Sequence, residues 1–170
     1  MPSETLVDRS RAPACYLDAL GTGADAHEGL LHGVALLPSL VPGCDHASAT
    51  TPRMLGVQVR AATDDAARRA DDLQHELGEG PVLQALRTGH SVIAHDLHTE
   101  TRWPRWHVRA VDELGLASAL SVLLVSQQRP LGTLNLYSRR RAGLSDVDIA
   151  LLHGLADPLT TTLLDAVRAR

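Results

Sequence analysis

Apolar residues recur at three- and four-residue steps in two stretches of the chain, one near each end. In residues 27–40 they are Leu30, Leu31, Val34, Leu37 and Leu40. In residues 149–167 they are Leu152, Leu155, Ala156, Leu159, Leu163 and Val167. This spacing places the apolar side chains on one side of an α-helix, so each stretch is predicted to be an amphipathic helix. Pro158 lies inside the second stretch and is expected to kink that helix without ending it.

Alternating or continuous apolar positions predict strands between these two helices. The predicted strands cover residues 46–51, 55–63, 91–97, 119–125 and 130–138. In the second of them Leu55, Val57 and Val59 alternate with polar residues, which indicates one buried face. The fourth is almost entirely apolar, as is typical of a central strand.

Shorter helices are predicted around the third strand. Thr63 has the position of an N-cap for a helix ending near residue 75, and Pro81 suits the first position of a helix ending near residue 88. Residues 107–115 form another short helix, and Ser145 followed by Asp148 resembles a capping box before the last helix. Grouped strands with helices at both ends predict an α+β domain with a central antiparallel sheet.

Length and charge limit the classes of function. The 170 residues suit one domain, which we divide into an N-terminal extension of residues 1–24, partly helical, and a domain of residues 25–170. The net charge of −4 predicts no direct binding of nucleic acid, and no apolar run reaches the about 18 residues that cross a membrane.

The residue types also indicate an origin and a location. Two cysteines, Cys15 and Cys44, make no disulfide framework, and the N-terminus has no secretory signal, so we expect a cytoplasmic protein. The chain contains no lysine and no phenylalanine. That bias is typical of a GC-rich bacterial genome, because the codons of both residues are AT-rich.

Several segments of the middle and the later strands resemble a GAF domain. They are "AATDDAARRADDLQHELGEGPVLQALRTG", "RWPRW", "GLASALSVLL" and "PLGTLNLYS". The resemblance covers roughly residues 25–168 and is closest to the GAF half of bacterial regulators that pair GAF with an RNA-binding ANTAR domain. It implies a six-stranded antiparallel sheet with helices on both faces, and with the N- and C-terminal helices packed together.

The resemblance also implies a function. GAF domains of this kind are sensory: a small molecule sits between the sheet and the helical middle, and the terminal helices form a homodimer. An ANTAR domain normally follows the last helix, whereas this sequence ends at Arg170. We therefore expect either a stand-alone GAF protein that acts through a regulatory protein partner, or a fragment of a longer chain. A ligand-free dimerisation or protein-interaction module is the alternative.

The turn "GEGP" holds three candidate ligand-binding residues, Glu79, Gly80 and Val82. Free backbone N–H groups at the start of the helix after Pro81 could bind an anion. Alternatively, Glu79 caps those N–H groups itself, and the turn is only a structural corner.

Five further residues are candidates for the ligand pocket. Trp103 and Trp106 supply half of all aromatic residues, and they either roof the pocket or fill the core under a loop. Asp96 either orders a loop or adds a polar group to the pocket. Ser121 and Asn135 lie in predicted strands, where they either line a cavity or face solvent.

Catalytic and metal sites find little support in the sequence. Residues 90–98 contain three histidines, but side chains alternate along a strand, and this spacing is poor for one tetrahedral metal site. No nucleophile elbow, P-loop or H-E-x-x-H motif is present. GAF-type methionine sulfoxide reductases need cysteines in the domain middle and in later strands, and Cys15 and Cys44 come too early. The sequence therefore predicts a non-enzymatic protein without a metal, and it names no cofactor.

Overall fold

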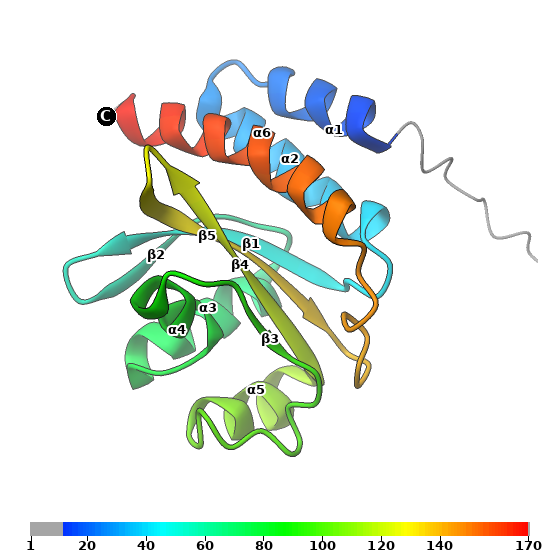
Figure 1. Ribbon diagram of the computed structural model, residues 1–170, viewed down its shortest axis with the longest axis vertical. Coiled ribbons are helices and arrows are strands. Elements are labelled where there is room, and N and C mark those ends of the chain that lie inside the picture. The colour runs from blue at the N-terminus through cyan, green and yellow to red at the C-terminus, as the bar shows by residue number, and fades with distance from the viewer. Residues whose placement is uncertain (1–11, 170) are drawn as a thin grey trace, which may run out of the picture.

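A five-stranded sheet forms the centre of the protein, and helices cover both of its faces (Figure 1). The computed structural model describes residues 12–169. The strands are β1 (His46–Arg53), β2 (Gly56–Ala62), β3 (Val92–Ala94), β4 (Ser118–Ser126) and β5 (Arg129–Ser138). They lie in the order β2-β1-β5-β4-β3, and every neighbouring pair is antiparallel.

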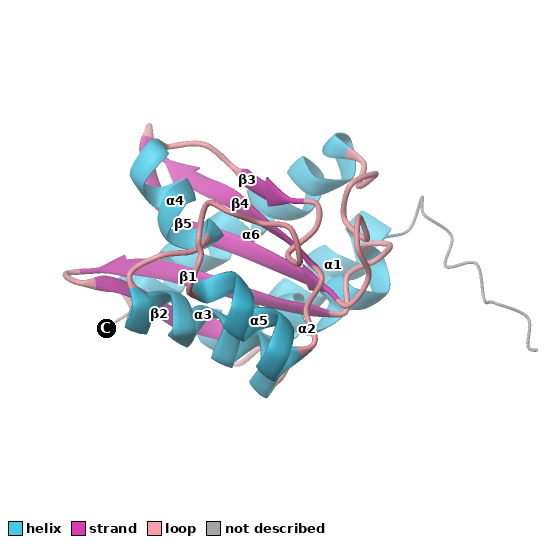
Figure 2. Ribbon diagram, turned by 90° about the horizontal axis from the view of Figure 1, so that it is seen from below, coloured by secondary structure: helices cyan, strands magenta, loops and turns pink. Residues whose placement is uncertain are grey.

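Three helices lie on each side of the sheet, and one of them, α1, packs on the other terminal helices rather than on the strands. The terminal helices are α1 (Ala12–Gly21), α2 (Ala26–Leu40) and α6 (Ile149–Arg168). The middle helices are α3 (Asp65–Leu77), α4 (Pro81–Thr88) and α5 (Trp106–Leu114). Figure 2 shows α3 and α5 in front of the sheet and the terminal helices behind it. The helices α1 and α2 both contact α6, so the two ends of the described chain meet on one face.

The predicted α+β fold, with an antiparallel sheet and helices on both faces, is confirmed. The described residues contain five strands, whereas the family resemblance implied six. The helix α6 runs through Pro158 without a break, as the apolar pattern predicted. The division of the chain into an extension of residues 1–24 and a domain of residues 25–170 stays a prediction.

Side-chain alternation along the strands separates two cores. Leu134 and Leu136 of β5 pack with residues of the terminal helices such as Leu37 and Leu155. Tyr137 points the other way, into a cluster that α3, α4 and α5 contribute to. A displacement of β5 is therefore felt on both faces of the sheet.

Three local predictions are corrected by the structure. Asp64 rather than Thr63 is the N-cap of α3, because the Thr63 hydroxyl is used on the backbone of β1. Asp148 rather than Ser145 caps α6, where its carboxylate accepts two N–H groups of the first turn. Leu55, expected on a buried face, lies at the tip of the β1–β2 hairpin with 82% of its surface exposed.

No helix within residues 12–169 is long and apolar enough to cross a membrane.

Candidate ligand-binding site

Six polar side chains are buried between the sheet and α3, and together we call them the polar cluster. They are Ser48, Asp71, Gln74, Ser121, Asn135 and Tyr137. Each has 0% of its surface exposed. The register of three neighbouring strands brings three of these side chains together. Asn135 of β5 lies opposite Ser48 of β1 on one side and opposite Ser121 of β4 on the other. The helix α3 adds Asp71 and Gln74 from its buried side.

Hydrogen bonds link most of the polar cluster into one network. The Tyr137 hydroxyl donates to Asp71 Oδ1 at 2.5 Å, and Gln74 Nε2 donates to the Tyr137 oxygen at 3.0 Å. Asn135 Nδ2 donates to Ser48 Oγ at 3.1 Å and lies 3.4 Å from Asp71 Oδ1. The network fixes the orientation of the Asp71 carboxyl and the Asn135 amide relative to each other.

Three buried atoms of the polar cluster have no hydrogen-bond partner within residues 12–169. They are Asp71 Oδ2, Asn135 Oδ1 and Ser121 Oγ. Buried polar groups are nearly always paired, and leaving one unpaired costs about 1–3 kcal/mol. Two of the three atoms are acceptors when Asp71 is ionised, and the third belongs to a hydroxyl that can accept. This arrangement suits a small molecule that brings N–H or O–H donors.

Burial controls the charge of this site. It raises the pKa of Asp71 from 3.8 to about 7, although hydrogen bonding to Ser48, Tyr137 and Asn135 opposes that rise. Burial, followed by the nearby Asp71, also raises the pKa of Tyr137 well above its usual value. Asp71 therefore changes between its neutral and ionised forms near neutral pH, while Tyr137 stays a hydroxyl.

The "GEGP" turn supports the polar cluster through Gln74. The Val82 N–H donates to Gln74 Oε1 at 2.8 Å, and the Gln84 N–H donates to the Gly80 carbonyl. Gly80 has φ of 141°, and a Cβ built there would lie 2.3 Å from Gln74 Oε1. Two of the donors considered for an anion are thus already used, and the geometry favours a structural corner.

Glu79 caps α5 instead of α4. Its carboxylate accepts the backbone N–H groups of Arg105 at 2.6 Å and Trp106 at 2.9 Å. Partial burial opposes ionisation, but these bonds and the Arg105 guanidinium lower the pKa of Glu79 overall. The side chain thus ties the turn after α3 to the start of α5.

Replacing Glu79 with alanine is expected to lower the free energy of unfolding by about 1–2 kcal/mol, because two helix-start N–H groups lose their acceptor. Chemical denaturation measures the loss. Glu113→Ala is the matched control, since Glu113 forms an exposed ion pair with Arg109 four residues away. Such a pair on a helix surface contributes about 0.5 kcal/mol or less. Equal losses in the two variants would contradict the capping role.

The two tryptophans belong to the core between the middle helices and the sheet. Trp106 is fully buried and donates to the Ala70 carbonyl at 3.0 Å, while Trp103 donates to Gln84 Oε1 at 3.0 Å. Their rings meet edge to face, with centroids 5.9 Å apart. This geometry favours the core-filling alternative over direct contact with a ligand.

Asp96 lies apart from the polar cluster, in the loop after β3. It accepts from the backbone and the ring of His98, and Arg141 lies 3.5 Å from it. Although desolvation opposes it, these contacts lower the pKa of Asp96. The observed contacts are those of a loop-ordering carboxylate.

Of the eight candidate residues, the structure brings Ser121 and Asn135 into the polar cluster and connects Val82 to it through Gln74. Asp71, Gln74 and Tyr137 were not predicted as site residues. One signal for the first two was available: they fall on the same helix face as Ala67 and Ala70.

Neither cysteine lies in the polar cluster. Cys44 is buried in the core beneath the terminal helices, and Cys15 is exposed on α1. Within the described part of the chain, no group of three or more metal-ligating side chains is placed to hold a metal ion.

The profile of the GAF domain family matches residues 13–163. The chain belongs to the GAF domain family. No curated protein matches the sequence. The solved structures that resemble this GAF domain include the free methionine-R-sulfoxide reductase of Neisseria meningitidis, with 16% identity, a TM-score of 0.71, and coverage of 100% of this chain and 96% of that chain.

Two further structures come from other classes of protein. One is the GAF domain of an Acinetobacter phosphoenolpyruvate-protein phosphotransferase, with 14% identity, a TM-score of 0.69, and coverage of 95% and 96% of the two chains. The other is the chromophore-binding domain of a bacteriophytochrome from R. palustris, with 14% identity, a TM-score of 0.63, and coverage of 95% and 63%. At these identities the likeness shows a shared fold.

The expectation of a non-enzymatic protein is corrected by these structures. Methionine sulfoxide reductases of two further sources, Thermoplasma acidophilum and Staphylococcus aureus, also share the fold. The prediction was wrong because the lack of known catalytic motifs and of cysteines at certain positions does not exclude catalysis in a fold that enzymes also use. Membership of this fold therefore gives no ground for excluding catalysis.

Proposed function

We propose that this GAF domain is a sensory domain that binds a small molecule at the polar cluster and passes the binding to its terminal helices. One observation carries the proposal: three fully buried polar atoms, Asp71 Oδ2, Asn135 Oδ1 and Ser121 Oγ, lack a partner within residues 12–169. A ligand that donates to these atoms would satisfy all three at once.

The chemistry of the three atoms selects the class of ligand. An ionised Asp71 and the Asn135 carbonyl accept hydrogen bonds, so a head group with several N–H donors fits them best. A positive charge on that group would also offset the cost of a buried carboxylate. We therefore propose a small ligand with a primary ammonium or guanidinium group. Because every side chain of the polar cluster has 0% of its surface exposed, entry of a ligand requires a local opening of the protein around the cluster.

The route to the terminal helices passes through β5. Asn135 faces the polar cluster, while its neighbours Leu134 and Leu136 face the core beneath the terminal helices. A shift of Asn135 on binding would move these two side chains against α2 and α6. That coupling is short, because it crosses only the thickness of one strand.

We propose that the terminal helices form a homodimer or contact a regulatory protein, as the resemblance to the GAF half of GAF–ANTAR regulators suggests. Exposed Leu17, Leu31 and Ile149 lie on these three helices and support the proposal. Most of the apolar face of α2 and α6 is used inside the chain. These three side chains are therefore the first to test. A cytoplasmic location fits a protein with two free cysteines.

Proton-transfer chemistry is a second candidate for the same site. The Asp71 carboxyl, with a pKa raised by burial to about 7, is hydrogen-bonded to the Tyr137 hydroxyl. A buried acid that titrates near neutral pH suits general acid–base catalysis. A bound molecule that is chemically changed by the wild-type protein and left unchanged by Asp71→Asn would favour this candidate over sensing.

The first test is native mass spectrometry of the purified protein, with a denatured sample beside it. We expect an added small mass only in the native spectrum, and the same spectrum reports whether the protein is a dimer. Binding is then followed with methylamine as the simplest ammonium probe and acetate as the probe of opposite charge. Methylamine is expected to raise the melting temperature, since a ligand that binds only the folded state stabilises it.

Ser121→Ala sharpens this test. Ser121 Oγ has no protein partner to lose, so the free energy of unfolding should change by less than about 0.5 kcal/mol. The response to methylamine should nevertheless weaken several-fold. Ser126→Ala, on the same strand outside the polar cluster, is the matched control and should bind as the wild type does. An equal response in all three proteins would contradict binding at the polar cluster.

A further inference from the structure

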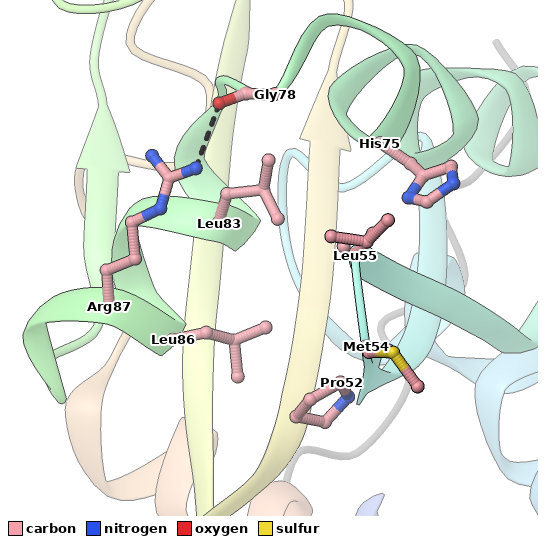
Figure 3. A pocket seen from close by; sticks show the side chains of 9 residues that line it. Pro52, Met54, Leu55, His75, Gly78, Leu83, Leu86 and Arg87 are labelled. Carbon is pink, nitrogen blue, oxygen red and sulfur yellow. Dashed lines mark hydrogen bonds between the residues drawn. The ribbon is translucent and has the colours of Figure 1, made fainter.

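A second hollow lies outside the polar cluster, between the tip of the β1–β2 hairpin and the helices α3 and α4 (Figure 3). We call it the hairpin groove. Its volume is about 430 Å³. Sites for small molecules commonly have volumes of roughly 300–1,000 Å³. The hairpin groove is therefore large enough for a ligand of modest size.

Large apolar side chains line most of the hairpin groove. Met54 and Leu55 come from the hairpin tip, and Leu83 and Leu86 come from α4. Met54 has 97% and Leu55 has 82% of its surface exposed, so nothing in the described chain covers them. Exposed apolar side chains gathered beside a hollow are typical of a binding surface rather than of scattered surface residues.

The polar groups of the hairpin groove are basic. Arg87 donates one hydrogen bond to the Gly78 carbonyl at 3.0 Å and has no carboxylate partner within residues 12–169. His75 has a buried Nδ1 without a hydrogen-bond partner. No acidic residue lines the groove. In Figure 3, Arg87 and His75 lie on either side of Leu83 and Leu55.

A single guanidinium beside an apolar wall matches one class of ligand. Arginine binds carboxylates through charge-assisted hydrogen bonds, and its bond to Gly78 holds the guanidinium at the edge of the groove. The four apolar side chains would then cover a hydrocarbon tail. We propose that the hairpin groove binds an amphipathic carboxylate, with its head on Arg87 and its tail on Met54, Leu55, Leu83 and Leu86.

This second site is distinct from the polar cluster in place and in chemistry. The polar cluster is fully buried and requires a hydrogen-bond donor, whereas the hairpin groove is open at the surface and offers a cation. The two sites meet at α3, which carries Gln74 into the cluster and His75 into the groove wall. The proposal for the hairpin groove does not depend on the proposal for the polar cluster.

The test is a titration of the isotope-labelled protein with octanoate, below its micelle-forming concentration, followed by amide NMR shifts. We expect the largest shifts at Gly56, Gly78 and Leu86. Octanol, which has the same tail without the charge, should bind about tenfold more weakly, the factor expected from one charge-assisted hydrogen bond. The reverse order, or shifts confined to other regions, would overturn the proposal.

Two variants separate the head from the tail. Arg87→Gln should weaken octanoate binding about tenfold and leave octanol binding unchanged. Arg68→Gln, on an exposed position of α3, removes the same charge elsewhere and should have no effect. Leu55→Ser changes an exposed side chain, so folding is not at risk, and it should weaken both probes. If both Arg87→Gln and Leu55→Ser bind octanoate as tightly as the wild type, the hairpin groove is not the binding site.

Discussion

Replacing Trp106 with alanine is expected to lower the free energy of unfolding by about 3–5 kcal/mol. The indole is fully buried between the middle helices and the sheet, and the variant would leave a cavity there. It would also leave the Ala70 carbonyl of α3 without the indole N–H that donates to it at 3.0 Å. The edge-to-face contact with Trp103 would be lost as well. Urea denaturation followed by circular dichroism measures the effect.

Trp106→Phe separates the ring from the hydrogen bond. It keeps most of the apolar volume and loses the N–H donor, so a smaller loss of about 1–2 kcal/mol is expected. This variant also keeps the test usable if the alanine variant does not fold. A loss below about 1 kcal/mol in Trp106→Ala would show that the indole does not hold α5 and α3 on the sheet.

The elements that the sequence predicted well are those decided by neighbours along the chain. Pro81 predicted the start of α4, because a proline acts through its own backbone geometry. The apolar spacing of residues 27–40 likewise gave α2, which ends at Leu40. Such signals need no knowledge of the rest of the fold.

The capping residues show where local reasoning stops. Thr63 and Asp64 are both good N-caps, and the choice between them depends on whether the Thr63 hydroxyl is needed elsewhere. It bonds to Ala47, sixteen residues away on β1. Ser145 likewise does not cap α6, because its hydroxyl is hydrogen-bonded to His95 Nδ1 at 2.6 Å. Only the paired strands and loops decide these contacts.

The polar cluster could be predicted only in part for the same reason. Ser121 and Asn135 attracted notice as polar residues in apolar strands, but nothing local places them opposite each other. Asp71 meets Tyr137 across 66 residues of sequence, and Gln74 meets it across 63. The one available signal was Asp71, an acidic residue on the same helix face as Ala67 and Ala70, and it was not among the predicted site residues.

Asp71→Asn is expected to make the ligand-free protein more stable at neutral and alkaline pH. Burial raises the pKa of Asp71 from 3.8 to about 7 in the folded state. Since one pKa unit corresponds to about 1.4 kcal/mol, ionised Asp71 costs the folded state roughly 4 kcal/mol. An asparagine keeps an acceptor for Tyr137 and carries no charge, so it avoids that cost.

The pH dependence follows from the direction of this shift. Below about pH 4 the carboxyl is neutral in both states, and its charge costs nothing. Between about pH 4 and pH 7 the unfolded chain has released the proton and the folded chain still binds it, so wild-type stability falls as the pH rises. Above about pH 7 the Asp71 carboxyl is ionised in both the folded and the unfolded state, so the loss of wild-type stability is complete and no longer changes with pH.

The measurement is the difference in unfolding free energy between Asp71→Asn and the wild type, from urea denaturation across this range. We expect the difference to rise in favour of the variant by roughly 4 kcal/mol from about pH 4 to pH 8. Asp112→Asn, on an exposed position of α5, is the control and should give a difference that does not depend on pH. A flat difference for Asp71→Asn would mean that the carboxylate finds a charge partner when it ionises. Methylamine should restore part of the wild-type stability at high pH and leave Asp71→Asn unchanged, because only the ionised carboxylate attracts an ammonium group.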